Sequence, residues 1–296
     1  MDPIILVVGA TGTLGGNVTR RLVARGHPVR AMVRDPSRFT VPGVDVVQGD
    51  LREPGSLRAA VQGVSQLLTT ANSFMGRGAT SPTKVDVPGY TALVAAAREA
   101  GVTRIVHVSA YGLTADNPVD YFRVKHRVDE VIKAGGIPWV LLKPAAFMDI
   151  WLDVVGGGIA KNGTATVFGD GRKVSNYIAV DDVAEYLVRI LERPEIRNEV
   201  IDVGGPSTIS AVEFAELIGR HLGRAVKIRH VPMAVLRLLP PLIRPFNEVI
   251  ARLMTMGHWS ASLDRPLVHW RVAADRFGLA PMGVEEWLGR QGKPGR

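Results

Sequence analysis

The chain has 296 residues, of which 46% are hydrophobic and 22% are charged, a composition typical of an ordinary globular protein and not of a disordered one. It contains no cysteine, which excludes disulfides, thiolate zinc sites, iron–sulfur clusters and cysteine nucleophiles. The formal net charge of +8 would suit nucleic acid, an anionic membrane or an anionic ligand, but lysine and arginine are scattered and no basic helix carries interleaved aromatics, so we expect no nucleic-acid partner.

The amino-terminal residues and the length of the apolar runs indicate where in the cell the protein is expected. The first strand is expected to begin by Ile4, with no basic-then-apolar leader before it. No apolar run approaches the roughly 18 to 20 residues that cross a bilayer. We therefore expect a cytoplasmic protein. The length of the chain would allow either one large α/β domain or two modest ones.

The amino-terminal stretch predicts a strand, a tight turn and a helix. Apolar residues 4–8 precede a glycine-rich loop, and an amphipathic pattern follows it. Gly9 would let the chain turn, Gly12 would let the backbone approach a pyrophosphate, and Gly15 would let the helix pack on the strand. The helix N-terminus would add unpaired N–H groups and a partial positive charge. In a chain with 32 glycines a chance turn is the alternative, but the expected phosphate cradle is Gly9, Ala10, Thr11, Gly12, Thr13, Leu14 and Gly15.

A second strand over residues 28–33 completes a βαβ unit and ends at Arg34. In dinucleotide-binding folds an acidic residue here suits the 2′-hydroxyl of NAD, whereas a basic one suits the 2′-phosphate of NADP. Arg34, with Arg38 four residues after it, therefore predicts a preference for NADP(H). The alternative is that Arg34 is only a solvated arginine at the end of a strand.

Two further loops at the carboxyl ends of expected strands are candidate cofactor contacts. Asp50 and Leu51 follow a strand over residues 44–48 and would hold the adenine, unless Asp50 caps the next helix. Thr70, Ala71 and Asn72 follow a strand over residues 64–70 and would pass under the phosphates and ribose.

A third group of residues could carry catalysis. Tyr121 and Lys125 are four apart, which places them on one face of a helix. A cation beside a phenol readies it to give a proton to a carbonyl under reduction. Ser109 follows a strand over residues 104–108 and could hold the substrate oxygen. Tyrosine and lysine at this spacing are also common on helix surfaces.

Together these motifs resemble the short-chain dehydrogenase/reductase family, and in particular its atypical, NmrA-like branch. The likeness rests on the G-x-x-G-x-x-G form of residues 9–15, on residues 33–36, 49–51 and 106–109, and on Tyr121-x-x-x-Lys125. Residues 139–144 and 178–184 are similar to that branch too, so the likeness covers nearly the whole chain.

The resemblance implies a doubly wound, parallel-sheet Rossmann fold of class α/β with a smaller C-terminal substrate domain. It also implies that Thr13 and Leu14 donate backbone N–H groups to the pyrophosphate, that Lys125 grips the nicotinamide ribose and that Pro144 lies beside the nicotinamide. The spacing from Ser109 to Tyr121 is shorter than in extended members, and many atypical members are cofactor sensors or assembly factors.

The remaining chain suggests the domain organisation. We expect an NADP-binding domain over residues 1–150, to which residues 174–204 return, and a partly helical substrate or lid domain over residues 151–296. Asp181 or Asp182 is expected to cap a helix that runs to Leu191, and residues 210–213 predict a capping box. The histidines lack ligand spacing with acidic partners, so no metal is expected.

Residues 233–257 are unusually apolar, are broken by prolines and contain several arginines. They predict core packing of the small domain, a lid over an apolar substrate, a dimer interface or a peripheral contact with anionic lipid. The protein itself would be a monomer or a homodimer.

Two functions are compatible with this pattern. The first is an NADPH-dependent reductase that delivers hydride to an apolar carbonyl or quinone-like substrate, with Tyr121 as proton donor, Lys125 beside it and Ser109 orienting the substrate. The second is a non-catalytic NADP(H)-responsive regulator or assembly factor.

Overall fold

The computed structural model describes residues 3–291, and the chain forms two compact units. Unit 1 comprises Met1–Lys143 and Val183–Ile201, and unit 2 comprises Pro144–Asp182 and Asp202–Arg296. Of the expected returning segment 174–204, only the part from Val183 to Ile201 belongs to unit 1.

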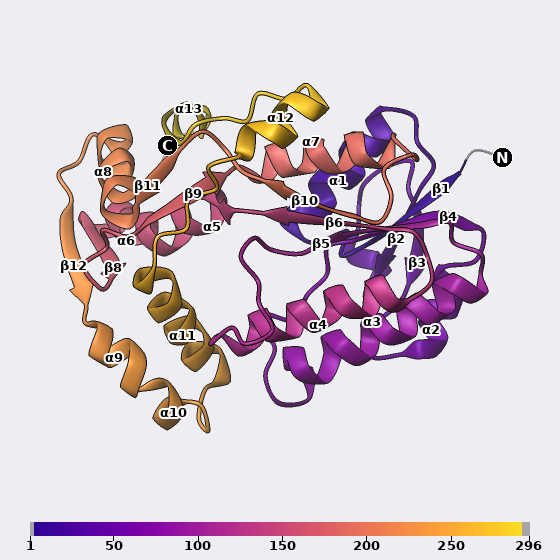
Figure 1. Cartoon of the computed structure of the whole chain (residues 1–296), viewed down its shortest axis with the longest axis horizontal. Helices are drawn as coiled ribbons and strands as arrows, with labels where there is room; N and C mark the ends of the chain where they lie inside the picture. Colours follow the sequence, from indigo (N-terminus) through magenta and orange to yellow (C-terminus); the bar gives the residue numbers. More distant parts are fainter. Residues whose placement is uncertain (1–2, 292–296) are drawn as a thin grey trace. The chain divides into compact units, whose positions relative to one another are not determined.

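Unit 1 is built on a seven-stranded sheet (Figure 1). Its strands are β1 Ile4–Val8, β2 Val29–Val33, β3 Asp45–Gln48, β4 Val64–Thr69, β5 Arg104–Val108, β6 Trp139–Pro144 and β10 Glu199–Val203. They lie in the order β10-β6-β5-β4-β1-β2-β3, and the neighbours from β3 to β6 are parallel. The order reverses between β1 and β4, where doubly wound sheets bind their ligands. The predicted fold class is confirmed.

Helices cover both faces of this sheet, so its central strands are buried (Figure 1). One face carries α1 Thr13–Ala24 and α7 Val180–Leu191, and the other carries α2 Pro54–Ala60, α3 Pro82–Glu99 and α4 Asp120–Ala134. Two short 3₁₀ turns, η1 Pro36–Arg38 and η2 Gly78–Thr80, lie in the connections. Arg25, just beyond α1, forms ion pairs with Glu185 and Glu192 of α7 and its C-terminal end, at 2.6 and 3.0 Å.

A buried arginine fixes the C-terminus of α7 to the sheet. Arg104, the first residue of β5, is 2% exposed. Its guanidinium donates to the carbonyls of Ile190, Leu191 and Ile196 at 3.0, 2.8 and 3.2 Å, and to Gln66 Oε1. It therefore adds a donor to carbonyls at and just beyond the end of α7, where the intrahelical hydrogen bonds stop, while burial lowers the pKa of Arg104 to about 10.

Unit 2 contains two small sheets and most of the remaining helices. Its strands form the orders β11-β9-β7 and β12-β8, with β7 Ala146–Phe147, β8 Thr164–Phe168, β9 Val174–Ile178, β11 Thr208–Ser210 and β12 Lys227–Val231. The helices are α5 Met148–Trp151, the π-helical turn η3 Leu152–Gly156, α6 Gly157–Asn162, α8 Ala211–Leu222, α9 Met233–Leu238, α10 Pro240–Ile243, α11 Glu248–Ser262, α12 Trp270–Phe277 and α13 Val284–Arg290.

The core of unit 2 is aromatic, with the rings of Tyr177 and Phe214 stacked at 5.0 Å between centroids. Phe214 belongs to α8, whose predicted capping box is confirmed. Ser210 Oγ accepts from the Glu213 N–H, and the Glu213 carboxylate accepts from the Ser210 N–H.

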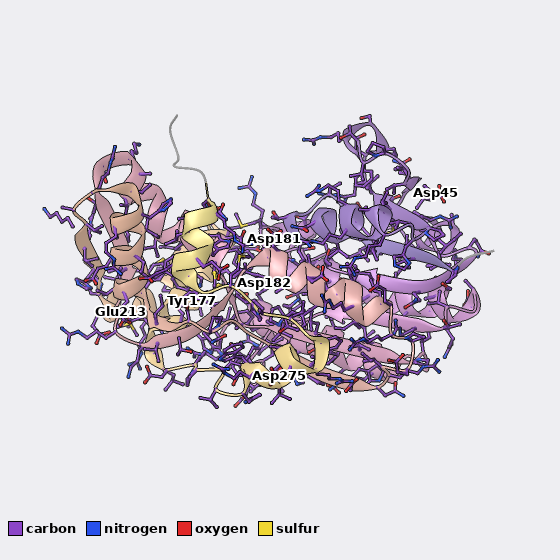
Figure 2. The ribbon with its side chains drawn as sticks, turned by 90° about the horizontal axis from the view of Figure 1, so that it is seen from above. Asp45, Tyr177, Asp181, Asp182, Glu213 and Asp275 are labelled. Carbon is purple, nitrogen blue, oxygen red and sulfur yellow. The ribbon has the colours of Figure 1, made fainter. Side chains whose placement is uncertain are left out.

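The start of α7 differs from the expectation. The helix begins at Val180, before Asp181 and Asp182 (Figure 2), and the Val180 N–H donates to Asp149 Oδ2 at 3.0 Å. Asp182 Oδ2 instead accepts from the Met282 N–H at 2.9 Å. The predicted capping role for Asp182 is therefore wrong, because its carboxylate is used to hold a distant segment of the same unit.

Arg104→Met should lower the free energy of unfolding by about 3 to 5 kcal/mol, because several buried carbonyls at and beyond the end of α7 would each lose the donor that Arg104 supplies. Urea denaturation measures the change. Arg58→Met is the control, because Arg58 is 66% exposed and its carboxylate partner lies 4.0 Å away. An equally small effect in both variants would contradict the assigned role of Arg104.

Candidate active site

The turn after β1 forms a close-packed backbone cradle in unit 1. Gly9 has φ +98°, and a Cβ there would lie 2.5 Å from Thr70 Oγ1 and 2.7 Å from the Ala71 nitrogen. A Cβ at Gly15 would lie 2.2 Å from the Gly9 carbonyl oxygen. Both positions are thus closed to any side chain, so the turn and α1 come nearer to each other and to residues 70–71 than other residues would permit.

The N-terminus of α1 is arranged to receive an anion. Gly12 is its N-cap, no side chain caps it and no acidic residue lies in its first turn. Thr11, Gly12 and Thr13 are exposed, and Leu14 is half-buried. Unpaired N–H groups and the helix dipole at such an end favour a phosphate. These residues therefore fit the pyrophosphate of a dinucleotide.

The loop after β4 packs against the glycine turn of the cradle. Thr70 Oγ1 donates to the Val8 carbonyl at 3.3 Å, and the Ala71 carbonyl accepts from the Tyr90 hydroxyl at 2.7 Å. Asn72 Oδ1 accepts from the Phe74 N–H at 3.1 Å. The structure thus brings residues 70 and 71 against the glycine turn, as the expected position of this loop requires.

Three arginines lie around the carboxyl ends of β2 and β3. Arg34 and Arg38 are exposed, and the Asp35 carboxylate between them accepts from the Ser37 N–H and hydroxyl. The third, Arg52, was not predicted from the sequence, and it pairs with Asp50 at 2.6 Å.

The carboxylate of Asp50 is therefore already engaged. The hydrogen bond from Arg52 lowers the pKa of Asp50 against its partial burial, and the charge of Arg34 acts in the same direction. Asp50 does not cap α2, whose N-cap is Glu53. Leu51 follows Asp50 in the chain and is half-buried.

Tyr121 and Lys125 lie on the same buried side of α4. Lys125 Nζ is 5.9 Å from the centre of the Tyr121 ring and donates to the Val108 carbonyl at 3.0 Å. The ring of Phe74 meets that of Tyr121 edge-on at 4.9 Å. Burial lowers the pKa of Lys125, while the charges of Asp129 and Asp86 oppose that shift.

A buried polar cluster lies next to this pair. Asp129 is 1% exposed, and its Oδ2 accepts from the Ser109 hydroxyl at 2.7 Å and lies 3.5 Å from Lys143 Nζ. Its Oδ1 lies 3.7 Å from His107 Nε2, and His107 Nδ1 is 2.6 Å from Thr69 Oγ1. Burial raises the pKa of Asp129 and lowers that of His107 well below its usual range.

The hydrogen bond to Asp129 limits the hydrogen bonds that Ser109 can make with other groups. Because its proton is directed to Asp129, the Ser109 hydroxyl presents lone pairs, not a donor, to any other group. Asp129 and Lys143 were missed by the sequence analysis, since a single acid in a helix and a single lysine in a strand give no local signal. Pro144, also a candidate, is buried at the end of β6.

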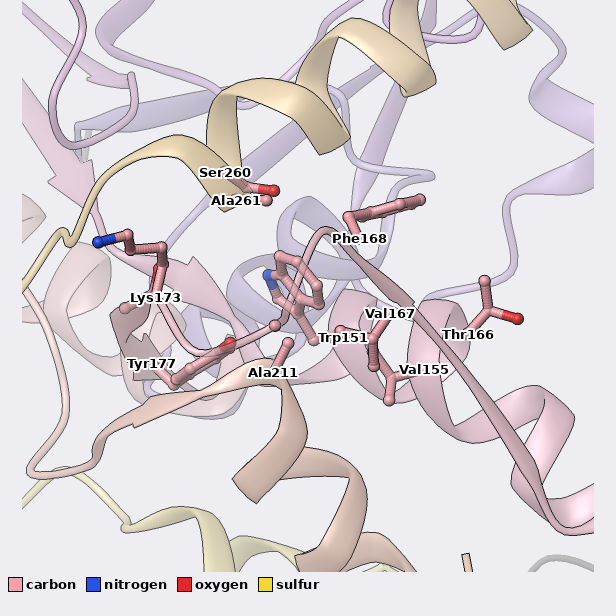
Figure 3. Close-up of a pocket in the computed structure, with 12 residues that line it drawn as sticks. Trp151, Val155, Thr166, Val167, Phe168, Lys173, Tyr177, Ala211, Ser260 and Ala261 are labelled. Atoms are coloured by element: carbon pink, nitrogen blue, oxygen red, sulfur yellow. The ribbon is translucent and has the colours of Figure 1, made fainter. Parts of the chain in front are cut away.

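Unit 2 contains a small cavity lined by aromatic, aliphatic and polar residues, into which Trp151 projects (Figure 3). The rings of Trp151 and Tyr177 meet edge-on at 6.1 Å. The cavity measures about 20 Å³, room for about one water molecule. It does not accommodate an organic substrate.

Among residues 3–291, no group of three or more His, Asp or Glu side chains is placed to hold a metal ion. Within the same residues, no helix combines the length and apolarity needed to cross a bilayer.

The similarity of this chain to known NAD(P)H-binding proteins agrees with the geometry of unit 1. The NAD(P)H-binding family matches residues 9–194. The NAD(P)H azoreductase of Xenophilus azovorans is 32% identical over 227 residues, which cover 76% of each chain. A photosystem II assembly factor of Trieres chinensis is 26% identical over 246 residues, or 82% of this chain and 76% of that one.

Among solved structures, the triphenylmethane reductase of Citrobacter sp. complexed with NADP(H) superposes with a TM-score of 0.78. It is 22% identical, and the match covers 97% of this chain and 99% of that one. At this identity the likeness shows a shared fold.

Gly15→Ala should weaken NADPH binding by about tenfold or more, because the new Cβ would push α1 away from the turn and displace the N–H groups of its first residues. Isothermal titration measures the affinity. Gly55→Ala is the matched control, because Gly55 is also helical and a Cβ there meets nothing within 4 Å. Unchanged affinity in Gly15→Ala would contradict the cradle.

Proposed function

Because the chain belongs to the NAD(P)H-binding family, and resembles the NmrA-like branch of the short-chain dehydrogenases/reductases throughout its length, we propose that it is an NADPH-dependent reductase. Its substrate would be a small apolar molecule with a carbonyl, quinone-like or similarly conjugated acceptor. The observation that carries this proposal is the presence in unit 1 of both the glycine cradle and the buried Tyr121–Lys125 pair.

The preference for NADP(H) over NAD(H) rests on charge. Arg34 and Arg38 are exposed beyond β2, and the Asp35 carboxylate between them accepts hydrogen bonds from Ser37. Guanidinium groups bind phosphate through paired charge-assisted hydrogen bonds. The 2′-phosphate would be held by Arg34 and Arg38, and the pyrophosphate by the N–H groups of Thr13 and Leu14.

The bound nicotinamide supplies the hydride, and the residues of the chain supply position and a proton. Tyr121 Oη gives its proton to the substrate atom that gains negative charge. The buried ammonium of Lys125 stabilises the phenolate that remains, since Coulomb attraction is strong where water is excluded.

Ser109 and Asp129 act as positioning residues in this proposal. Asp129 orients the Ser109 hydroxyl through the 2.7 Å hydrogen bond and is itself held near Lys143. Ser109 would then accept a hydrogen bond from a reduced product, while Tyr121 is the donor. Asp50, Leu51, Thr70, Ala71, Asn72 and Pro144 remain proposed cofactor contacts.

A second candidate is a non-catalytic NADP(H)-responsive regulator or assembly factor. The relative named as a photosystem II assembly factor, at 26% identity, supports this alternative. The cytoplasmic location and the choice between monomer and homodimer stay predictions.

Arg34→Ala should weaken NADPH binding by about 1.5 to 3 kcal/mol, the scale of a charge-assisted hydrogen bond, and leave NADH binding nearly unchanged. Isothermal titration with both nucleotides measures the difference, and Arg58→Ala, another exposed arginine of unit 1, is the control. Equal losses for NADPH and NADH would argue against a 2′-phosphate contact.

Tyr121→Phe should reduce turnover of an apolar quinone or azo acceptor by about 10²-fold or more, the usual contribution of a positioned proton donor. NADPH affinity should be retained, because the ring and its contacts remain. Consumption of NADPH is followed optically, with Tyr186→Phe, a buried tyrosine of α7, as control. Equal rates in wild type and Tyr121→Phe would favour the regulator.

A further inference from the structure

Unit 2 carries an exposed apolar surface on three consecutive helices. Six large aliphatic or aromatic side chains of α9, α10, α11 and their connections reach solvent, and we name them the helical apolar surface: Leu238, Leu239, Leu242, Phe246, Ile250 and Leu253. Phe246 is 89% exposed, Leu242 67% and Leu238 64%. Ile250 and Leu253 are three residues apart in α11 and so lie on one side of it, and Phe246 lies just before the N-cap Asn247 of that helix.

This surface is additional to the face that anchors the same helices. Leu236 of α9 and Ala251 of α11 are 2% and 3% exposed, and a Cβ at Gly257 would lie 3.0 Å from the ring of Phe168. The three helices follow one another as a short bundle in Figure 1. Because the inner face is already packed, the six exposed side chains are not needed for the core of unit 2.

The surrounding charge is strongly positive. Residues 224–262 contain six lysines and arginines and a single acidic residue, Glu248. Arg237 directly precedes Leu238 in the chain, and Arg244 lies between Leu242 and Phe246. Both arginines are exposed. The most exposed apolar residues therefore have exposed arginines as close neighbours in the chain.

We propose that the helical apolar surface docks on the surface of an anionic lipid membrane. Apolar side chains flanked by arginines match the boundary between acyl chains and negatively charged headgroups. A second copy of the chain fits less well, because a two-fold symmetric interface through this surface would bring the same positive groups together. Docking would place the protein where apolar molecules are concentrated.

Co-sedimentation of the full chain with vesicles tests the proposal. Binding to phosphatidylcholine vesicles that contain about one third phosphatidylglycerol should be at least about tenfold tighter than to phosphatidylcholine alone, and should weaken in high salt. The paired change Leu242→Ser and Phe246→Ser should weaken it by about tenfold or more. Arg237→Gln with Arg244→Gln should remove the preference for anionic vesicles.

The matched control is Val268→Ser with Val272→Ser, since these side chains are 80% and 68% exposed in unit 2 but lie outside the helical apolar surface. It should bind vesicles like wild type. Circular dichroism confirms folding of each variant, and NADPH affinity should be unchanged in all of them. Vesicle binding therefore tests membrane docking, and NADPH affinity tests the nucleotide site separately, so a failure of one proposal is distinguished from a failure of the other.

Three results would overturn the proposal. The first is equal vesicle binding by wild type and by the Leu242→Ser, Phe246→Ser variant, and the second is no binding to anionic vesicles at all. The third is a dimer in solution that this variant converts to a monomer, as measured by light scattering, because a second copy would then cover the surface.

Discussion

The close approach of three pieces of backbone around Gly9 is the constraint on which the proposed site depends. Side chains at Gly9 or Gly15 would collide with Thr70, Ala71 or the Gly9 carbonyl. With glycine at both positions, β1, α1 and the loop after β4 pack directly on each other. The first N–H groups of α1 are then held at a fixed place beside the switch point of the sheet, where an anion can bind without reorganisation of the chain.

The second determinant is the buried polar cluster of Ser109, Asp129, His107 and Lys143 beside Lys125. Charges in such a place are costly unless they are paired, and here a carboxylate lies near two ammonium groups. The cluster comes from β5, α4 and β6, so it ties together the elements that carry the tyrosine and lysine. The proposed proton donor, Tyr121 on α4, is thereby attached to a rigid support.

Local patterns in the sequence predicted much of this structure. The glycine turn, the alternation of strands and helices and the Ser210–Glu213 capping box were found because each is specified within a few residues. The non-local pairs were not found. Asp149 caps α7 from 31 residues away, Asp182 bonds to Met282, and Arg104 reaches carbonyls about ninety residues on.

The side-chain partners of the site residues are non-local in the same way. Nothing near Ser109 in the chain indicated that its hydroxyl would donate a hydrogen bond to Asp129. Arg52 was overlooked because its pairing with Asp50 depends on side-chain conformation and not on spacing. The apolar stretch 233–257 was ambiguous because its pattern does not reveal which side chains face the core; the structure buries Leu236 and leaves Phe246 exposed.

The central claim is that unit 1 binds a phosphorylated dinucleotide through the turn at Gly9, and titration of the wild-type protein with NADPH tests it most directly. Binding to the folded state should raise the unfolding temperature progressively, with a stabilisation of about 2.7 kcal/mol at a ligand concentration 100 times the dissociation constant. Nicotinamide fluorescence should change over the same range. Neither a shift in unfolding temperature nor a fluorescence change at millimolar NADPH would contradict the account.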